Sequence, residues 1–218
     1  MKERFSRCIA VTVALFCMAS VGLAQSEPKY KELPNFHQVN ERLYRGAQPK
    51  RGGISRLAQL GIKTIVNLRP DDERSQAEEQ EARAAGLRYF NMSVEKVTPV
   101  GALKSLADLR HFNTPFNSLG RPTDEQVERV LAIINAPENQ PVFVHCKRGA
   151  DRTGTIIAIY RIEHDGWTSE RAKAEANRYG MAWWERGKKD YIRDYYRRRL
   201  QRTVTDFAPG VVYLHRAD

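Results

Sequence analysis

A strand, a loop and a helix are predicted to meet in residues 142–154, which read Val142-Phe143-Val144-His145-Cys146-Lys147-Arg148-Gly149-Ala150-Asp151-Arg152-Thr153-Gly154. The apolar run at the start of this segment follows Pro141 and predicts a short buried strand. A second apolar run, 156–159, continues toward Gly166 and has the length of a buried helix. Cys146 therefore lies in the predicted turn between the strand and the helix.

The predicted loop has the chemistry of an anion-binding site. The first amides of a helix have no acceptor within the helix, and the helix dipole places partial positive charge there. Such amides, together with a guanidinium, favour the thiolate form of a cysteine, which makes Cys146 a candidate nucleophile. Arg152 can hold two phosphoryl oxygens with its planar fork, Gly149 permits backbone conformations closed to other residues, and Thr153 can offer a hydroxyl to the sulfur.

The extended pattern His-Cys-x-x-Gly-x-x-Arg-Thr-Gly in residues 145–154 resembles the signature loop of the cysteine-dependent protein tyrosine and dual-specificity phosphatases. The pair Lys147-Arg148 is similar to the atypical dual-specificity phosphatases of plants and fungi, some of which act on inositol pyrophosphates. Asp151, directly before the arginine, is similar to bacterial phosphatases that act on phosphotyrosine and phosphoinositides. The resemblance covers residues 40–180, and its specific part is the loop.

The resemblance implies a role for each residue of the loop. It makes Cys146 the nucleophile and Arg152 the phosphate clamp, it makes Asp151 a candidate general acid, and this chemistry requires neither a metal nor a cofactor. His145 is interpreted as a partner that orients the loop beside the thiolate rather than as a metal ligand. The residues expected to contact the substrate are Lys147, Arg148, Gly149, Ala150, Thr153 and Gly154.

The general acid stays open between three carboxylates, Asp151, Asp124 and Asp108. Related phosphatases carry the acid on a mobile loop ahead of the cysteine, which corresponds here to residues 95–121. That segment has no pattern similar to Trp-Pro-Asp. Asp124 is more typical of a helix start and Asp108 of a solvated helix face, while Asp151 could simply bond to its own loop or to a nearby basic side chain.

Strand-like and helix-like segments alternate along the rest of the chain. Short β-prone runs predict strands at 43–49, 62–68 and 87–94, besides 142–144. Helical patterns lie at 54–60, 71–85, 100–112, 123–134, 156–166, 167–180 and 190–202. We expect an α/β fold with a central, largely parallel sheet flanked by helices, as in the phosphatases. The charge run of 71–85 is interpreted as an exposed face, and 190–202 as an amphipathic helix that packs its tyrosines and exposes its arginines.

Four segments are predicted along the chain: a signal peptide at 1–24, a lead-in at 25–39, a dual-specificity-phosphatase-like catalytic domain at 40–202, and a tail at 203–218 with an edge strand at 211–214. A basic start, an apolar core and small residues before position 25 predict cleavage near Ala24 and export to the periplasm or the medium. An uncleaved membrane anchor is the alternative. Cleavage would leave Cys146 as the only cysteine, so the mature chain could form no internal disulfide.

The charge of the chain favours an anionic partner, since 36 basic residues exceed 26 acidic ones and give a formal net charge of +10. We expect a phosphomonoester hydrolase with a cysteinyl-phosphate intermediate that acts on phosphotyrosine, on a phosphoprotein or on a polyanionic phosphate ester. The alternatives are an inositol polyphosphate or phosphoinositide phosphatase and a non-catalytic phosphate-binding module. We expect a monomer without a nucleic-acid partner, and the basic segment 190–202 suggests a weak contact with an anionic membrane surface.

Overall fold

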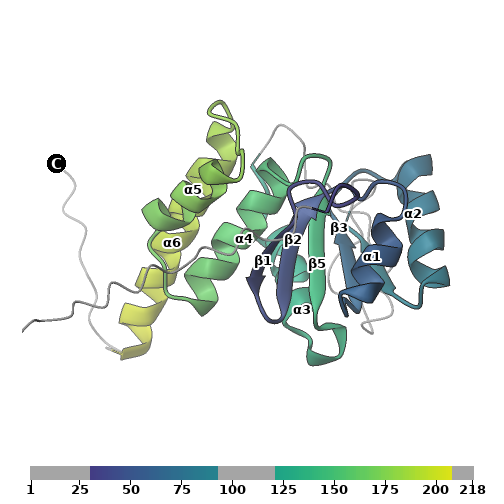
Figure 1. The fold of residues 1–218 in the computed structure, drawn as a ribbon. Coiled ribbons are helices and arrows are strands. Elements are labelled where there is room, and N and C mark those ends of the chain that lie inside the picture. Colours follow the sequence, from purple (N-terminus) through teal and green to yellow (C-terminus); the bar gives the residue numbers. More distant parts are fainter. Residues whose placement is uncertain (1–29, 93–120, 208–218) are drawn as a thin grey trace, which may run out of the picture.

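The computed structural model describes residues 30–92 and 121–207, which form a five-stranded sheet with helices on both faces (Figure 1). The order across the sheet is β1-β2-β5-β3-β4, with β1 antiparallel to β2 and all other neighbours parallel. This confirms the expected α/β fold with a largely parallel sheet. The strands are β1 (His37–Asn40), β2 (Leu43–Ala47), β3 (Thr64–Asn67), β4 (Arg88–Asn91) and β5 (Val142–Cys146).

Side-chain caps explain where three of the helices begin. Asp72, Thr123 and Thr168 each accept a hydrogen bond from an amide in the first turn that follows them. The cap at Thr123 is reciprocal, because Gln126 accepts from the Thr123 amide. No helix in the described ranges is long and apolar enough to span a bilayer. The helices are α1 (Gly53–Gln59), α2 (Glu73–Ala84), α3 (Asp124–Asn135), α4 (Asp151–His164), α5 (Ser169–Arg178) and α6 (Arg186–Phe207), with a 3-10 turn at Pro137–Asn139.

The central strand β5 is buried on both of its faces. Side chains alternate along a strand, so Val144 and Cys146 point to one face of the sheet while Phe143 and His145 point to the other. The first face packs in a core with α3, α4, α5 and α6, and Phe143 packs in a second core with α1 and α2. Figure 1 shows these two groups of helices on opposite sides of the sheet. Packing therefore fixes the strand that leads into the loop from both sides.

Two predicted boundaries differ from the structure. The described end of the predicted lead-in 25–39 is ordered, because Leu33 is buried and β1 begins at His37. A short polar edge strand has no apolar alternation, so the pattern does not reveal it. α6 continues to Phe207, past the predicted domain boundary at 202. The predictions that lie outside the described residues are the signal at 1–24, the helix at 100–112, Asp108, nearly all of the predicted acid loop and the strand at 211–214.

α6 confirms the interpretation of 190–202 as an amphipathic helix. Tyr191 and Tyr195 are buried in the larger core. Arg197 is largely exposed, and Arg198 pairs with Asp124 at the start of α3 at 2.7 Å. The helix thus packs its aromatic face on the domain, while its arginines lie at the surface or pair with acidic groups.

Two glycines let the loop after β5 lie directly against β2. Gly149 has a φ of +67°, and a Cβ at this position would lie 2.4 Å from both the carbonyl carbon and the oxygen of Gly46. The contacted atoms are backbone of a central strand, so they cannot move aside as a flexible side chain would. Only glycine therefore fits at position 149.

We predict that Gly149→Ala lowers the free energy of unfolding by at least about 3 kcal/mol, because a backbone clash is added to the strain of a left-handed alanine. Gly166→Ala is the matched control, since Gly166 has a φ of +65° but a Cβ there meets nothing within 4 Å. The control is expected to cost about 1 kcal/mol. Urea unfolding of both variants measures the difference, and equal losses would contradict a role for the close approach.

Candidate functional site

The carbonyl groups of the loop between β5 and α4 are held by hydrogen bonds. Asn35 Nδ2 donates to the carbonyl of Arg148 at 3.1 Å and to that of Gly149 at 3.2 Å. Arg45 Nη2, from β2, also donates to the Gly149 carbonyl, at 2.8 Å. The carbonyls of residues 150 and 151 accept bonds from the first turn of α4. The backbone oxygens along the loop are therefore engaged with the protein itself.

The amide groups of the same loop are left free. Within the described residues, no acceptor bonds the backbone N–H groups of residues 147–153. Because its carbonyls are hydrogen-bonded and its amides are free, the loop presents amide donors to a ligand, and the dipole of α4 adds partial positive charge. Such an arrangement binds a tetrahedral oxyanion such as phosphate.

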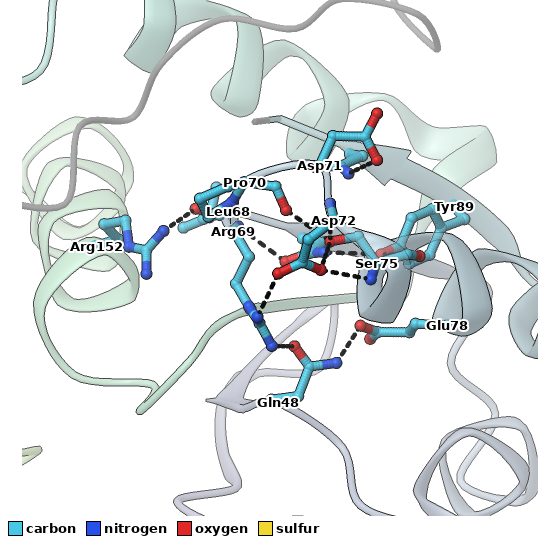
Figure 2. A network of polar contacts seen from close by, with 12 residues as sticks. Gln48, Leu68, Arg69, Pro70, Asp71, Asp72, Ser75, Glu78, Tyr89 and Arg152 are labelled. Carbon is cyan, nitrogen blue, oxygen red and sulfur yellow. Dashed lines mark hydrogen bonds and ion pairs between the residues drawn. The ribbon is translucent and has the colours of Figure 1, made fainter. Parts of the chain in front are cut away.

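The predicted nucleophile and the predicted clamp lie at the two ends of this loop. Cys146 ends β5, is buried and forms no disulfide. Arg152 lies in the first turn of α4, and its Nη1 donates to the carbonyl of Leu68, after β3, at 2.7 Å (Figure 2). That bond fixes one side of the guanidinium and leaves further N–H groups for a ligand. Among the described residues, no group of three or more His, Cys, Asp or Glu is arranged to hold a metal.

A buried guanidinium lies on the same side of the sheet as the sulfur. Arg45 is 1% exposed, and its Cζ lies 4.2 Å from the ring centroid of Tyr179. Its Nε and Nη1 have no hydrogen-bond partner in the described part of the chain. Burial lowers the pKa of Arg45 to about 10, so it is still charged at neutral pH, and its charge interacts with Glu175, Tyr179 and Cys146. A cation in such surroundings is weakly screened and favours the thiolate.

Polar side chains connect Glu78 of α2 to Gln48 and Arg69, which follow β2 and β3 (Figure 2). Glu78 of α2 is 5% exposed, and its Oε1 lies 2.9 Å from Nε2 of His145, in a direction that does not suit a hydrogen bond. Gln48 donates to the other oxygen of Glu78 and accepts from Arg69 at 2.7 Å. Arg69 in turn pairs with Asp72 at 2.8 Å. The residue before the predicted nucleophile therefore has a buried carboxylate beside it.

Both carboxylate oxygens of Asp151 are occupied. Its Oδ2 pairs with Arg148 at 2.6 Å, which raises the pKa of that guanidinium, and its Oδ1 accepts from the amide of Ala182 at 2.9 Å. Asp151 could donate a proton only after leaving Arg148, and in this arrangement it holds the loop to the segment before α6. That segment continues with Trp183 and Trp184, whose side chains are 74% and 56% exposed and meet edge to face.

The other acid candidates lie elsewhere. Asp124 faces α6 instead of the loop, since it accepts from the Tyr191 hydroxyl at 2.8 Å and from Arg198 at 2.7 Å. Asp108 lies outside the described residues. Asp71, which no sequence pattern singles out, is exposed and follows β3 at the same edge of the sheet as the loop, because β3 and β5 are parallel.

The loop residues expected to bind substrate differ in exposure. Lys147 and Arg148 are exposed, so their charges can reach a ligand. The expected bond from Thr153 to the sulfur is not formed, because the buried hydroxyl has no partner among the described residues. The Gly154 amide donates to the Ala150 carbonyl at 2.7 Å and is therefore not free for a substrate. The buried members are Gly149, Ala150, Thr153 and Gly154.

A family model described as "DSP-PTPase phosphatase fused to NAD+ Kinase" matches residues 23–194. The chain belongs to this phosphatase family. It is 30% identical over 161 residues to the dual specificity protein phosphatase TpbA of Pseudomonas aeruginosa, in an alignment that covers 73% of this chain. The same alignment covers 59% of TpbA, so the chain spans less than two thirds of that relative.

Two further comparisons relate this family member to known phosphatases. The crystal structure of TpbA in complex with pTyr matches with a TM-score of 0.56 and 26% identity, and the match covers 78% of this chain and 90% of that one. An inositol diphosphatase of Arabidopsis thaliana is 26% identical over 127 residues, which cover 58% of this chain and 54% of that protein. Related chains therefore include enzymes named for two kinds of phosphorylated substrate.

The sequence patterns do not single out three residues of this site: Asn35, Arg45 and Glu78. Asn35 falls in the predicted lead-in. Glu78 lies in the charge run of 71–85, and the interpretation of that run as an exposed face is wrong at this position, because Glu78 faces His145. The sequence does carry a signal for Arg45, because a charged residue inside a strand next to a buried strand is rarely tolerated without a partner.

We predict that Arg45→Met slows the alkylation of Cys146 by iodoacetamide at pH 6 about tenfold, because loss of a nearby positive charge leaves less thiolate. Arg45→Lys keeps the charge and is expected to lose less. Arg42→Met, which removes an exposed charge just before β2, is the control and should stay within about twofold of the unmodified protein. If Arg45→Met changes thermal stability but not the alkylation rate, Arg45 does not act on the sulfur.

Proposed function

We propose that this chain is a phosphomonoester hydrolase that works through a cysteinyl-phosphate intermediate. One observation carries the proposal: the free amides of residues 147–153 belong to the same loop as the free thiol of Cys146 and the guanidinium of Arg152. A phosphate-binding module without catalysis would need the amides but not the thiol. Membership of the phosphatase family supports the same conclusion.

The geometry suits a two-step reaction. The Cys146 thiolate attacks the phosphorus in line, so that a P–S bond forms while the P–O bond to the leaving group breaks and that oxygen takes a proton from a general acid. Water then attacks the phosphorus, the P–S bond breaks, and the thiolate is restored as inorganic phosphate leaves. Arg152 and the loop amides stabilise the equatorial oxygens in both steps. Arg45 favours the thiolate at the start and at the end of the cycle.

For the substrate we propose phosphotyrosine, a phosphoprotein or a polyanionic phosphate ester. The relatives support this range, because TpbA is named a dual specificity protein phosphatase and the Arabidopsis relative an inositol diphosphatase. The exposed side chains of Lys147 and Arg148 add positive charge beside the loop and would attract an anionic substrate. An inositol polyphosphate or a phosphoinositide is the alternative within the same chemistry.

The proposal predicts hydrolysis of p-nitrophenyl phosphate that vanadate inhibits and that Cys146→Ser lowers at least about a thousandfold. The serine variant keeps the loop, so it should still bind phosphate, and calorimetric titration checks that the site is intact. If the unmodified protein binds phosphate but hydrolyses no aryl phosphate, it is a binding module and the enzyme assignment is wrong.

The role of Asp151 is tested by the acidity of the leaving group. Phenol has a pKa of about 10, like tyrosine, and leaves poorly without a proton, whereas p-nitrophenol is more acidic. If Asp151 is the acid, Asp151→Asn should lower kcat for phenyl phosphate about tenfold more than for p-nitrophenyl phosphate. It should also flatten the fall of kcat between acid and neutral pH, because the acid works only while protonated.

The matched control for this test is Asp165→Asn, which changes a second ion-paired aspartate at the far end of α4. It should leave both the leaving-group ratio and the pH profile in place. An unchanged ratio and profile in Asp151→Asn would assign that residue to positioning alone and the acid to another carboxylate.

A further inference from the structure

A hollow of about 670 Å³ lies beside the catalytic loop. Three segments line it: residues 35 and 37 from the approach to β1 and its start, residues 148 and 150 from the loop, and residues 178–180 from the end of α5. It adjoins the part of the loop where the backbone oxygens of residues 148 and 149 are engaged. The hollow is therefore a neighbour of the anion site, and none of its lining residues is acidic.

Two arginines give this hollow its charge. Arg178 ends α5, is exposed and pairs with no other residue that the structure describes. The Arg148 side chain is 56% exposed and uses one N–H group for Asp151, which leaves others for a ligand. His37 lies at the same hollow, with its ring 4.4 Å from that of Tyr179. Arg178 therefore offers its whole guanidinium and Arg148 offers the N–H groups that Asp151 does not use, and such N–H groups can bind the oxygens of a phosphate.

The walls of the hollow are held in place before any ligand binds. Asn35 has a φ of 52°, which a residue other than glycine seldom adopts, and its Nδ2 donates to the carbonyls of Arg148, Gly149 and Tyr179. One amide group thereby joins all three lining segments. The ring of Tyr179 is in turn fixed against the buried guanidinium of Arg45. A site that is already arranged loses less conformational entropy on binding an anion.

We propose that this hollow is a second anion site, which takes a further phosphate group of a small polyphosphorylated substrate while the reacting phosphate lies in the catalytic loop. The inference rests on the proposed function and narrows its substrate class. Arg148 is part of the loop and also lines the hollow, so two neighbouring phosphates of one molecule could reach both sites. A substrate with a single phosphate would use the loop alone.

The test compares two inhibitors of p-nitrophenyl phosphate hydrolysis, inositol hexakisphosphate and inorganic phosphate. The hexakisphosphate should inhibit at a concentration at least about 100-fold lower, because it can fill both sites. Arg178→Ala should raise its inhibition constant about tenfold, and should raise that of inorganic phosphate far less. Arg74→Ala, which removes an exposed arginine from α2, is the control for net charge and should alter neither constant more than about twofold.

Three results would overturn the second site. The hexakisphosphate and inorganic phosphate could inhibit at similar concentrations, Arg178→Ala could weaken both inhibitors equally, or Arg74→Ala could match its effect. A separate measurement does not depend on activity: Cys146→Ser is titrated calorimetrically with inositol hexakisphosphate, with and without Arg178→Ala. A tenfold loss of affinity there supports the second site even if the protein hydrolyses nothing, in which case the proposed function alone has failed.

Discussion

The loop after β5 depends on one constraint: its backbone oxygens are held by side chains, so its amides remain for a ligand. Asn35 and Arg45 make the bonds that matter most, and both come from segments far from the loop in the sequence. Without these bonds the peptide groups of the loop could rotate, and the loop would no longer present only amide donors to a ligand. The glycine contact between positions 46 and 149 makes these bonds possible, because it lets the loop lie against β2. The anion site therefore depends on β2 and on the residues before β1 as well as on the loop itself.

The buried charges of Arg45 and Glu78 lie on opposite faces of the sheet, because side chains alternate along β5. Arg45 shares a face of the sheet with Cys146, so the sulfur meets a cation in dry surroundings. His145 points to the opposite face, where the buried carboxylate of Glu78 approaches it. Buried charges cost stability unless they are paired or serve a reaction, and here one is carried by β2, the neighbour of β5, and the other lies beside His145 of β5. The sheet therefore places a buried guanidinium and a buried carboxylate on opposite faces of β5.

The sequence predicts the local parts of this structure well. The strand, the loop and the helix around Cys146, and the capping box at Thr123, are all confirmed, because each is set by neighbours within a few residues. The parts that escape prediction are set by distant contacts. β1 is polar and short, and Asn35, Arg45 and Glu78 acquire their roles only when the sheet brings them to the loop. The sequence allows Asp151 to be a candidate acid or to bond to its own loop or a nearby basic side chain. In the structure it bonds to Arg148 and to the amide of Ala182.

The exposed side chains of Trp183 and Trp184 bear on the intrinsic fluorescence of the protein. A hydrogen bond from the neighbouring Ala182 amide to Asp151 connects the segment of these indoles to the loop, so an oxyanion that displaced Asp151 would change the surroundings of the indoles. Trp167, which is flanked by the guanidinium groups of Arg161 and Arg171, belongs to a different segment. Tryptophan emission would therefore offer a probe of the loop that needs no attached dye.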